Sequence, residues 1–182
     1  TADLSHTRDV VVTESGRRRQ RTVDTPRDYA GYTFGYNDPA FVCSVHDLLT
    51  ILRHLRSLPH GGPTEVAVVA FADAAPVAIA ARIVAGDAID RMAVDTGGFR
   101  FASLDDWRHP LFLPGAVRYL DVPGMIAAGT VPLRLAGEPS TMLLGADVAV
   151  ERIGEPGDSR EATVEWLVDS RTAHAGRRAE PP

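Results

Sequence analysis

Lysine is missing from this 182-residue sequence, so all 19 basic residues are arginines. Cysteine occurs once, at Cys43, which excludes an internal disulfide framework and a zinc site built from several cysteines. No apolar run approaches the roughly 18 residues that a membrane span requires. Residues 1–7 also lack the basic and apolar segments of a secretory signal. We therefore expect a cytoplasmic protein without membrane contacts, in which Cys43 is a small buried residue.

Basic residues are also fewer than acidic ones: 24 acidic residues against 19 arginines give a net charge of −5. This balance argues against nucleic acid as the main partner. The basic run at 16–21 is therefore interpreted as a solvated loop; the alternative is a patch for phosphate or an acidic partner. The aromatic residues Tyr29, Tyr32, Phe34 and Tyr36 either stack on a sugar or base or anchor a long loop onto the core, and we favour the anchor. No set of side chains has metal-ligand spacing, so we expect neither a metal nor a cofactor.

Hydrophobic periodicity predicts alternating helices and strands. Apolar residues recur every three or four positions over 40–58, which predicts an amphipathic helix. The apolar run at 66–71 predicts a strand buried on both faces, followed by an alanine-rich helix at 75–85. The remaining expected elements are strands at 8–13, 89–94, 131–136 and 147–151 and a closing helix at 159–169. Such alternation is typical of βαβ units and a parallel sheet.

We therefore predict an α/β fold, with a mostly parallel sheet of about four or five strands and helices on both faces. Residues 1–28 are expected to form an N-terminal segment with an edge strand and the basic loop. Residues 29–170 would form the domain, and 171–182 a disordered tail. A long excursion at 103–130, rich in Trp, His, Pro and Gly, is expected to cap or line a site.

The turn after the 66–71 strand is the first candidate site. Ligands of α/β folds bind beyond the carboxyl ends of parallel strands, where a strand turns into a helix. The residues at 70–74 read AFADA, which has the spacing of a nucleophile elbow, small-x-Ser-x-small. The serine position holds Ala72. The turn therefore has the pattern of a hydrolase elbow without its nucleophile.

Several further motifs extend this pattern in the same order. They are YTFGYN at 32–37, VHDLL at 45–49, the elbow at 70–74, DTGGFRF at 95–101 and FLPGA at 112–116. Together they resemble bacterial α/β-hydrolases, and among these the acetyl-xylan-esterase-like hydrolases. The similarity covers residues 29–169 and the later half of that fold. It implies a partial three-layer hydrolase-like sandwich.

The resemblance also assigns catalytic positions. It puts the nucleophile at Ala72, and the acid member of the triad at Glu138, which is equally an ordinary loop residue. Asp73 follows Ala72 and could as well be a helix N-cap. The histidine should lie between the last strand and the closing helix, but residues 153–160 contain none, and His174 lies beyond that helix.

Ester hydrolysis in this fold needs a nucleophile, a base and a carboxylate that orients the base. We therefore expect a domain without serine-esterase activity, a pseudoenzyme that binds a small acyl or carbohydrate ligand or a partner. The alternative is a hydrolase of esters or carbohydrate-linked acyl groups. It would use Asp73, Asp95, Glu138 and His109 at the carboxyl edge of the sheet to activate water or hold a divalent metal. Simpler interpretations remain open, because Asp95 could cap a turn and His109 precedes Pro110 in a loop.

The resemblance finally implies that the early strands of the fold would lie upstream of Thr1. We therefore expect a fragment, a truncated gene product or a domain whose sheet is completed by a partner. Residues 8–13 could supply one strand of the earlier half. An apolar edge strand left unpaired in this way would favour self-association.

Overall fold

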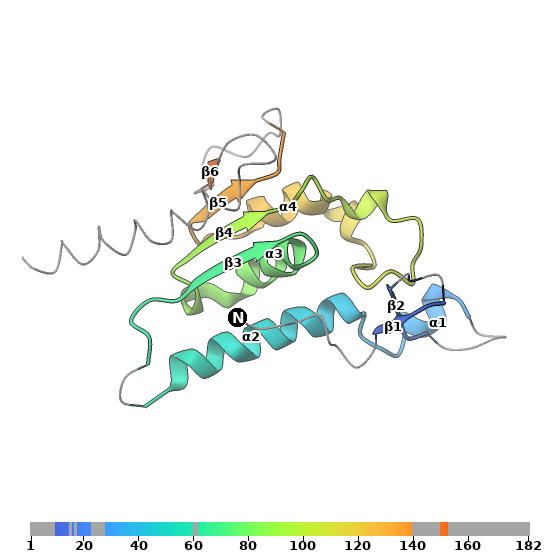
Figure 1. Ribbon diagram of the computed structural model, residues 1–182, viewed down its shortest axis with the longest axis horizontal. Helices are drawn as coiled ribbons and strands as arrows, with labels where there is room; N and C mark the ends of the chain where they lie inside the picture. Colours follow the sequence, from blue (N-terminus) through green and yellow to red (C-terminus); the bar gives the residue numbers. More distant parts are fainter. Residues whose placement is uncertain are drawn as a thin grey trace, which may run out of the picture.

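A parallel sheet with a layer of helices forms the centre of the protein (Figure 1). The computed structural model describes residues 10–14, 16, 18–22, 28–59, 62–139 and 150–152. In these ranges the main sheet has the order β3-β4-β5-β6, with all neighbours parallel. Its strands are β3 (Ala67–Phe71), β4 (Arg91–Asp95), β5 (Leu133–Ala136) and β6 (Val150–Arg152). The helices are α1 (Ala30–Phe34), α2 (Ala40–Ser57), α3 (Ala74–Ala85) and α4 (Asp121–Ala128), with short 3₁₀ turns η2 (Gly86–Ala88), η3 (Phe101–Ser103) and η4 (Ala116–Tyr119). The predicted mixed α/β fold with a parallel sheet is therefore confirmed.

One face of the sheet carries most of the core. The register aligns Val68 with Met92 and Met92 with Leu133, so these three side chains lie on the same face of the sheet. Because side chains alternate along a strand, the residues two positions further along each strand lie on this face too. The buried apolar side chains of α3 belong to the same core cluster, which includes Val77 and Ile79. The register places Arg91 and Arg134 on the opposite face. The core therefore fills the space between the sheet and α3.

Helices α2, α3 and α4 form one layer, while α1 lies beside the β1–β2 hairpin (Figure 1). Helix α3 contacts β3 and β4, while α2 and α4 lie on either side of α3 (Figure 1). Helices on both faces of the sheet, as the sequence predicts, are not seen within the described ranges. The closing helix expected at 159–169 and the tail at 171–182 lie outside the described residues.

A buried arginine joins three parts of this layer. Arg82 of α3 is 1% exposed, and its Nε donates to the Val131 carbonyl at 2.7 Å. Its Nη1 donates to the Ile126 carbonyl in the last turn of α4 at 2.8 Å, where the negative end of the helix dipole favours a cation. Burial lowers the pKa of this guanidinium. The side chain thereby fixes α3 to α4 and to the chain entering β5.

The N-terminal segment differs from its prediction in two ways. β1 (Val10–Val12) pairs antiparallel with β2 (Arg18–Gln20) in a separate two-stranded sheet, so it is not an edge of the parallel sheet. The basic run is not simply a loop, because part of it forms β2. Gly16, with a φ of +75°, lies in the connection and lets the chain fold back. Hairpin pairing therefore replaces the solvated loop expected from charge alone.

The observed helix boundaries agree with the predicted ones where the hydrophobic periodicity extends over many residues. α2 matches the helix predicted at 40–58, while α4 was missed inside the predicted excursion at 103–130. α4 has only eight residues, and these include Pro123 and Gly124, so its periodicity is weak. The carboxylate of Asp121 stabilises its start by accepting backbone N–H bonds from Phe101 and Ala102, both at 2.9 Å.

The aromatic segment forms the short helix α1 instead of a loop. Phe34 packs against Trp107 and Phe112, with ring centroids 5.8 and 5.5 Å apart. This contact agrees with the predicted anchoring role. Cys43, expected to be buried, lies in the first turn of α2 and is half-buried.

Candidate functional site

The turn from β3 into α3 is sharp and strained. Ala72 has a φ of +50°, in the left-handed region that costs an alanine about 1–2 kcal/mol. The Ala75 N–H donates to the Ala72 carbonyl at 3.0 Å, so the helix begins within two residues of the strand end. Asp73 occupies the N-cap position, but its side chain makes no capping hydrogen bond. Its carboxylate is therefore not used by the helix.

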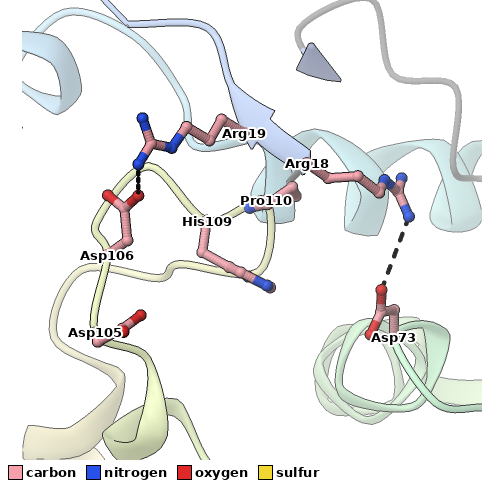
Figure 2. Close-up of a pocket in the computed structure, with 7 residues that line it drawn as sticks. All are labelled: Arg18, Arg19, Asp73, Asp105, Asp106, His109 and Pro110. Carbon is pink, nitrogen blue, oxygen red and sulfur yellow. Dashed lines mark ion pairs between the residues drawn. The ribbon is translucent and has the colours of Figure 1, made fainter. Parts of the chain in front are cut away.

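A charged pocket lies beside this turn, at the carboxyl end of β3 (Figure 2). Its volume is about 410 Å³. Three segments supply its walls: β2, the start of α3 and the loop after η3. The lining residues, called the elbow pocket below, are Arg18, Arg19, Asp73, Asp105, Asp106, His109 and Pro110.

Gln20 holds two of these segments together. The side chain is 4% exposed, and its Nε2 donates to the carbonyls of Trp107 and His109, both at 3.1 Å. Its Oε1 accepts the Ala40 N–H at 2.9 Å, at the start of α2. A buried amide with these bonds satisfied fixes β2 against the loop. Gln20 therefore positions Arg18 and Arg19 opposite His109.

Two of the charged side chains of the elbow pocket form an ion pair with each other. Arg19 forms an ion pair with Asp106 at 2.9 Å, and Arg108 approaches the same carboxylate at 3.7 Å. Burial alone would raise the pKa of Asp106. The backbone N–H of Arg108 and the charges of Arg19 and Arg108 outweigh burial and hold this pKa below its usual value. Arg19 and Asp106 therefore form a structural pair.

The other charged side chains of the elbow pocket are more exposed to solvent. Arg18 approaches Asp73 at 3.8 Å, which is too long for a hydrogen bond, and the two side chains are 42% and 70% exposed. Asp105 is exposed on the other side of His109 (Figure 2). Arg18, Asp73 and Asp105 are therefore the most exposed charged side chains of the elbow pocket.

His109 has a defined tautomer in this arrangement. Its Nδ1 accepts the backbone N–H of Leu111 at 3.1 Å, so the lone pair on Nδ1 is used. The proton of the neutral ring then lies on Nε2. Figure 2 shows the imidazole extending into the elbow pocket between Asp105 and Asp73. His109 therefore presents a hydrogen-bond donor, whereas a catalytic base in a triad presents a free Nε2 lone pair.

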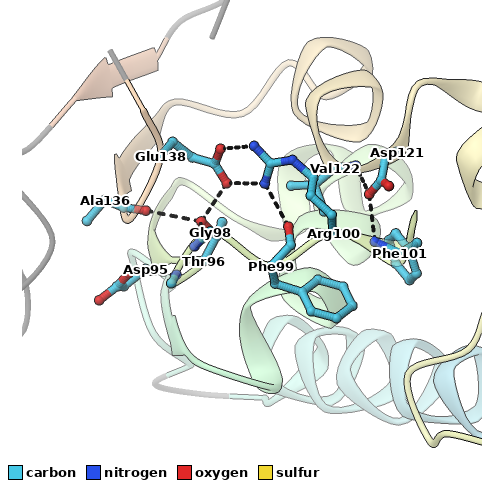
Figure 3. A network of polar contacts seen from close by, with 11 residues as sticks. Asp95, Thr96, Gly98, Phe99, Arg100, Phe101, Asp121, Val122, Ala136 and Glu138 are labelled. Atoms are coloured by element: carbon cyan, nitrogen blue, oxygen red, sulfur yellow. Dashed lines mark hydrogen bonds and ion pairs between the residues drawn. The ribbon is translucent and has the colours of Figure 1, made fainter. Parts of the chain in front are cut away.

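A second charged cluster joins the ends of β4 and β5 (Figure 3). Glu138, whose side chain is 1% exposed, forms a two-pronged ion pair with Arg100, in which Nη1 lies 2.8 Å from Oε1. The Thr96 hydroxyl donates to the same Oε1 at 2.5 Å. The bond to Glu138 raises the pKa of Arg100. We call Glu138, Arg100 and Thr96 the Glu138 cluster.

The structure therefore separates the candidate residues into two groups. Asp73 and His109 line the elbow pocket, while Glu138 is engaged by Arg100 and Asp95 caps the turn after β4 by accepting the Gly97 N–H at 2.9 Å. Neither Asp95 nor Glu138 lines the pocket. In the described part of the chain, no group of three His, Cys, Asp or Glu side chains is placed to hold a metal ion.

Sequence reasoning missed Arg18, Gln20 and Asp105. The sequence shows only that Gln20 interrupts the arginines of the basic run, which does not predict its hydrogen bonds to distant residues. Asp105 carried no signal.

Comparisons with known proteins give no relatives. No family model, curated protein or solved structure matches this chain. Among the helices of the described ranges, none has the length and apolar character needed to cross a membrane.

Proposed function

We propose that the chain is an α/β-hydrolase-like domain that binds a small molecule in the elbow pocket and has no serine-esterase activity. The observation that carries the proposal is Ala72, which combines a φ of +50° with a position between a parallel strand and a helix. A strained residue at this point is the backbone feature of a nucleophile elbow. An alanine has no other evident reason to adopt it.

The sheet supports the same proposal. Its parallel strands follow one another in chain order, and α3 crosses from β3 to β4 directly after the turn. The elbow pocket lies at the carboxyl end of β3, where ligands bind in α/β folds. The three-layer sandwich, the acyl or carbohydrate ligand and the cytoplasmic location expected from the sequence remain predictions.

The side chains argue against serine-type chemistry. The methyl group of Ala72 cannot attack a carbonyl, and the His109 tautomer offers a proton instead of a lone pair. Glu138, the acid position implied by the resemblance, is bonded to Arg100 and Thr96. These three differences remove nucleophile, base and orienting acid together.

A second candidate is a hydrolase with a different mechanism, because Asp73 and His109 share one pocket. Asp73 would act as general base on a water molecule, and the His109 Nε2–H would polarise the substrate carbonyl. This mechanism uses neither Asp95 nor Glu138. It predicts that Asp73 is essential for turnover.

Hydrolysis of p-nitrophenyl acetate tests both candidates. We expect the natural protein and the Ala72→Ser variant to match the buffer rate, because a serine alone lacks its base. Turnover that is lost in Asp73→Asn and retained in the exposed α2 variant Asp47→Asn would contradict the first proposal and support the second. Turnover gained only by Ala72→Ser would show that a base is present after all.

Self-association through the sheet edge, expected from the sequence, also remains a proposal. Among the described strands, β3 has β4 as its only neighbour in the sheet, and α2 lies beside α3. We expect light scattering at micromolar concentration to give the mass of a dimer or larger species. A single monomeric mass would contradict this proposal.

A further inference from the structure

His109 lies in a turn that links its side chain to the backbone that follows. The imidazole Nδ1 accepts the backbone N–H of Leu111 at 3.1 Å. Pro110, between the two residues, has no N–H, so Leu111 carries the first backbone donor after His109. Leu111 is 6% exposed and belongs to the core cluster, whereas His109 lines the elbow pocket. The bond therefore ties the wall of the pocket to the core.

Only a neutral imidazole can make this bond. A neutral ring has one lone pair, here on Nδ1, whereas in the imidazolium both ring nitrogens carry protons and can only donate. Protonation of His109 therefore places a hydrogen on Nδ1, opposite the Leu111 N–H. Two donors cannot bond to one another, so the contact must open. The N–H of a buried residue then loses its acceptor, which costs free energy until another acceptor replaces it.

The other bonds of the turn do not depend on the protonation state of the ring. The His109 N–H donates to the Asp106 carbonyl at 2.9 Å. The His109 carbonyl accepts from the Phe112 N–H at 2.9 Å and from the Gln20 side chain at 3.1 Å. All three bonds use the backbone of His109 and none uses the imidazole. The change on protonation is therefore confined to the ring and to the Leu111 amide.

Charged side chains from three segments surround the imidazole. They are Arg18 and Arg19 of β2, Asp73 of α3, and Asp105, Asp106 and Arg108 of the loop after η3 (Figure 2). Each of the three arginines forms an ion pair with an aspartate. Among the residues that line the pocket, the carboxylates outnumber the guanidinium groups. A cationic imidazole at this position therefore meets no excess of positive charge.

We propose that His109 is a pH-sensitive clasp in the wall of the elbow pocket. In the neutral form the clasp is closed, because the Leu111 N–H fixes the ring and the Nε2–H is directed into the pocket. In the protonated form it is open, because the ring is released and carries two donors instead of one. Histidines titrate between about pH 5 and pH 8, so the clasp closes at the upper end of this range and opens at the lower end. Its effect on a ligand of the pocket rests on the proposed function, but the clasp itself requires no ligand.

Amide hydrogen exchange, followed residue by residue by NMR, tests the clasp. The quantity measured is the protection of the Leu111 N–H relative to an unstructured amide at the same pH. This protection should fall at least about fivefold from roughly pH 8 to roughly pH 5. The Phe112 N–H, which is bonded to the His109 carbonyl, is the internal control and should keep its protection.

Two substitutions separate the acceptor from its protonation. In His109→Asn the side-chain oxygen accepts the N–H two residues on, as in an Asx turn, and it does not titrate. Leu111 protection in this variant should agree within about twofold at the two pH values, because the acceptor persists. His109→Ala has no acceptor, so its Leu111 protection should be low at both pH values.

The remaining outcomes would each overturn the clasp. Equal Leu111 protection at both pH values in the natural protein would show that protonation does not open the bond, and high protection in His109→Ala would show that the bond does not protect this amide. A loss in acid that persists in His109→Asn would assign the effect to another group. A parallel loss at Phe112 would show that the loop unfolds as a whole. These measurements use no ligand or substrate, so their failure is distinct from ester turnover, which would defeat the proposed function.

Discussion

The carboxyl edge of the sheet carries two charged clusters that treat their carboxylates differently. In the Glu138 cluster, a carboxylate with a 1% exposed side chain receives bonds from both prongs of Arg100 and from Thr96. In the elbow pocket, the Asp73 side chain is 70% exposed and forms a longer, 3.8 Å ion pair with Arg18. The carboxylate of the first cluster is buried and bonded, whereas that of the second is exposed to solvent.

This difference separates a buried structural carboxylate from an exposed one. The Glu138 cluster links the ends of two adjacent strands, so its bonds hold the sheet edge in place. The elbow pocket instead gathers side chains from segments far apart in sequence, and it lies beside the strained turn at Ala72. A charged residue at a strand end is therefore a weak functional signal until its partners are known.

The largest effect should come from breaking the Glu138 cluster. Glu138→Gln keeps the side-chain size but leaves Arg100 without its counter-charge, which should lower the free energy of unfolding by about 3 kcal/mol. Urea unfolding followed by tryptophan fluorescence measures this. Asp105→Asn in the elbow pocket is the matched control and should change the same quantity by less than about 0.5 kcal/mol. Equal effects of the two variants would remove the distinction between the clusters.

A smaller effect should follow from releasing the wall of the elbow pocket. Gln20→Leu leaves the buried Ala40 N–H without its acceptor and two carbonyls without their donor, which should cost about 2 kcal/mol. Hydrogen exchange should also quicken at residues 18–20, because β2 loses both side-chain bonds to the 107–109 loop and keeps only the backbone bond from the residue 20 N–H to the Arg108 carbonyl among the hydrogen bonds that the structure shows between residue 20 and this loop. Ser57→Ala removes an exposed hydrogen bond on α2 and should leave both measurements nearly unchanged. Unchanged exchange in Gln20→Leu would show that backbone pairing alone holds the hairpin.

The sequence predicted the fold better than it predicted the site. Strands β3, β4 and β5 and helices α2 and α3 lie within about two residues of their predicted bounds, because each buries a face with a clear period. α4 was missed because its eight residues are held by Asp121 and by packing, and neither leaves a periodic signal. Of the hairpin, the strand at 8–13 was predicted, but β2 was missed because its sequence, RRQ, is charged.

For the site, the sequence located the turn but not its surroundings. The small residues around Ala72 predicted a sharp bend, and the structure has one. Asp73 and His109 were both candidates, but nothing in their spacing of 36 positions showed that they share a pocket while Asp95 and Glu138 do not. The contribution of Arg18 depends on Gln20, a long-range hydrogen bond that sequence patterns do not encode.

The smallest expected effect concerns acid stability and the internal pair of the elbow pocket. The pKa of Asp106 is lower in the folded state, so its carboxylate stabilises the fold above the unfolded value of about 4 and loses that contribution as the pH falls through the folded value. Asp106→Asn should therefore lower the free energy of unfolding by about 1 kcal/mol near pH 7, and the difference from the natural protein should shrink as the pH falls below about 4. Urea unfolding at both ends of this range measures the change, and Arg19→Gln should reduce it by removing one of the charges that lower the pKa. A difference that stays constant into acid would show that Asp106 acts through packing and that its ion pair with Arg19 contributes little to stability.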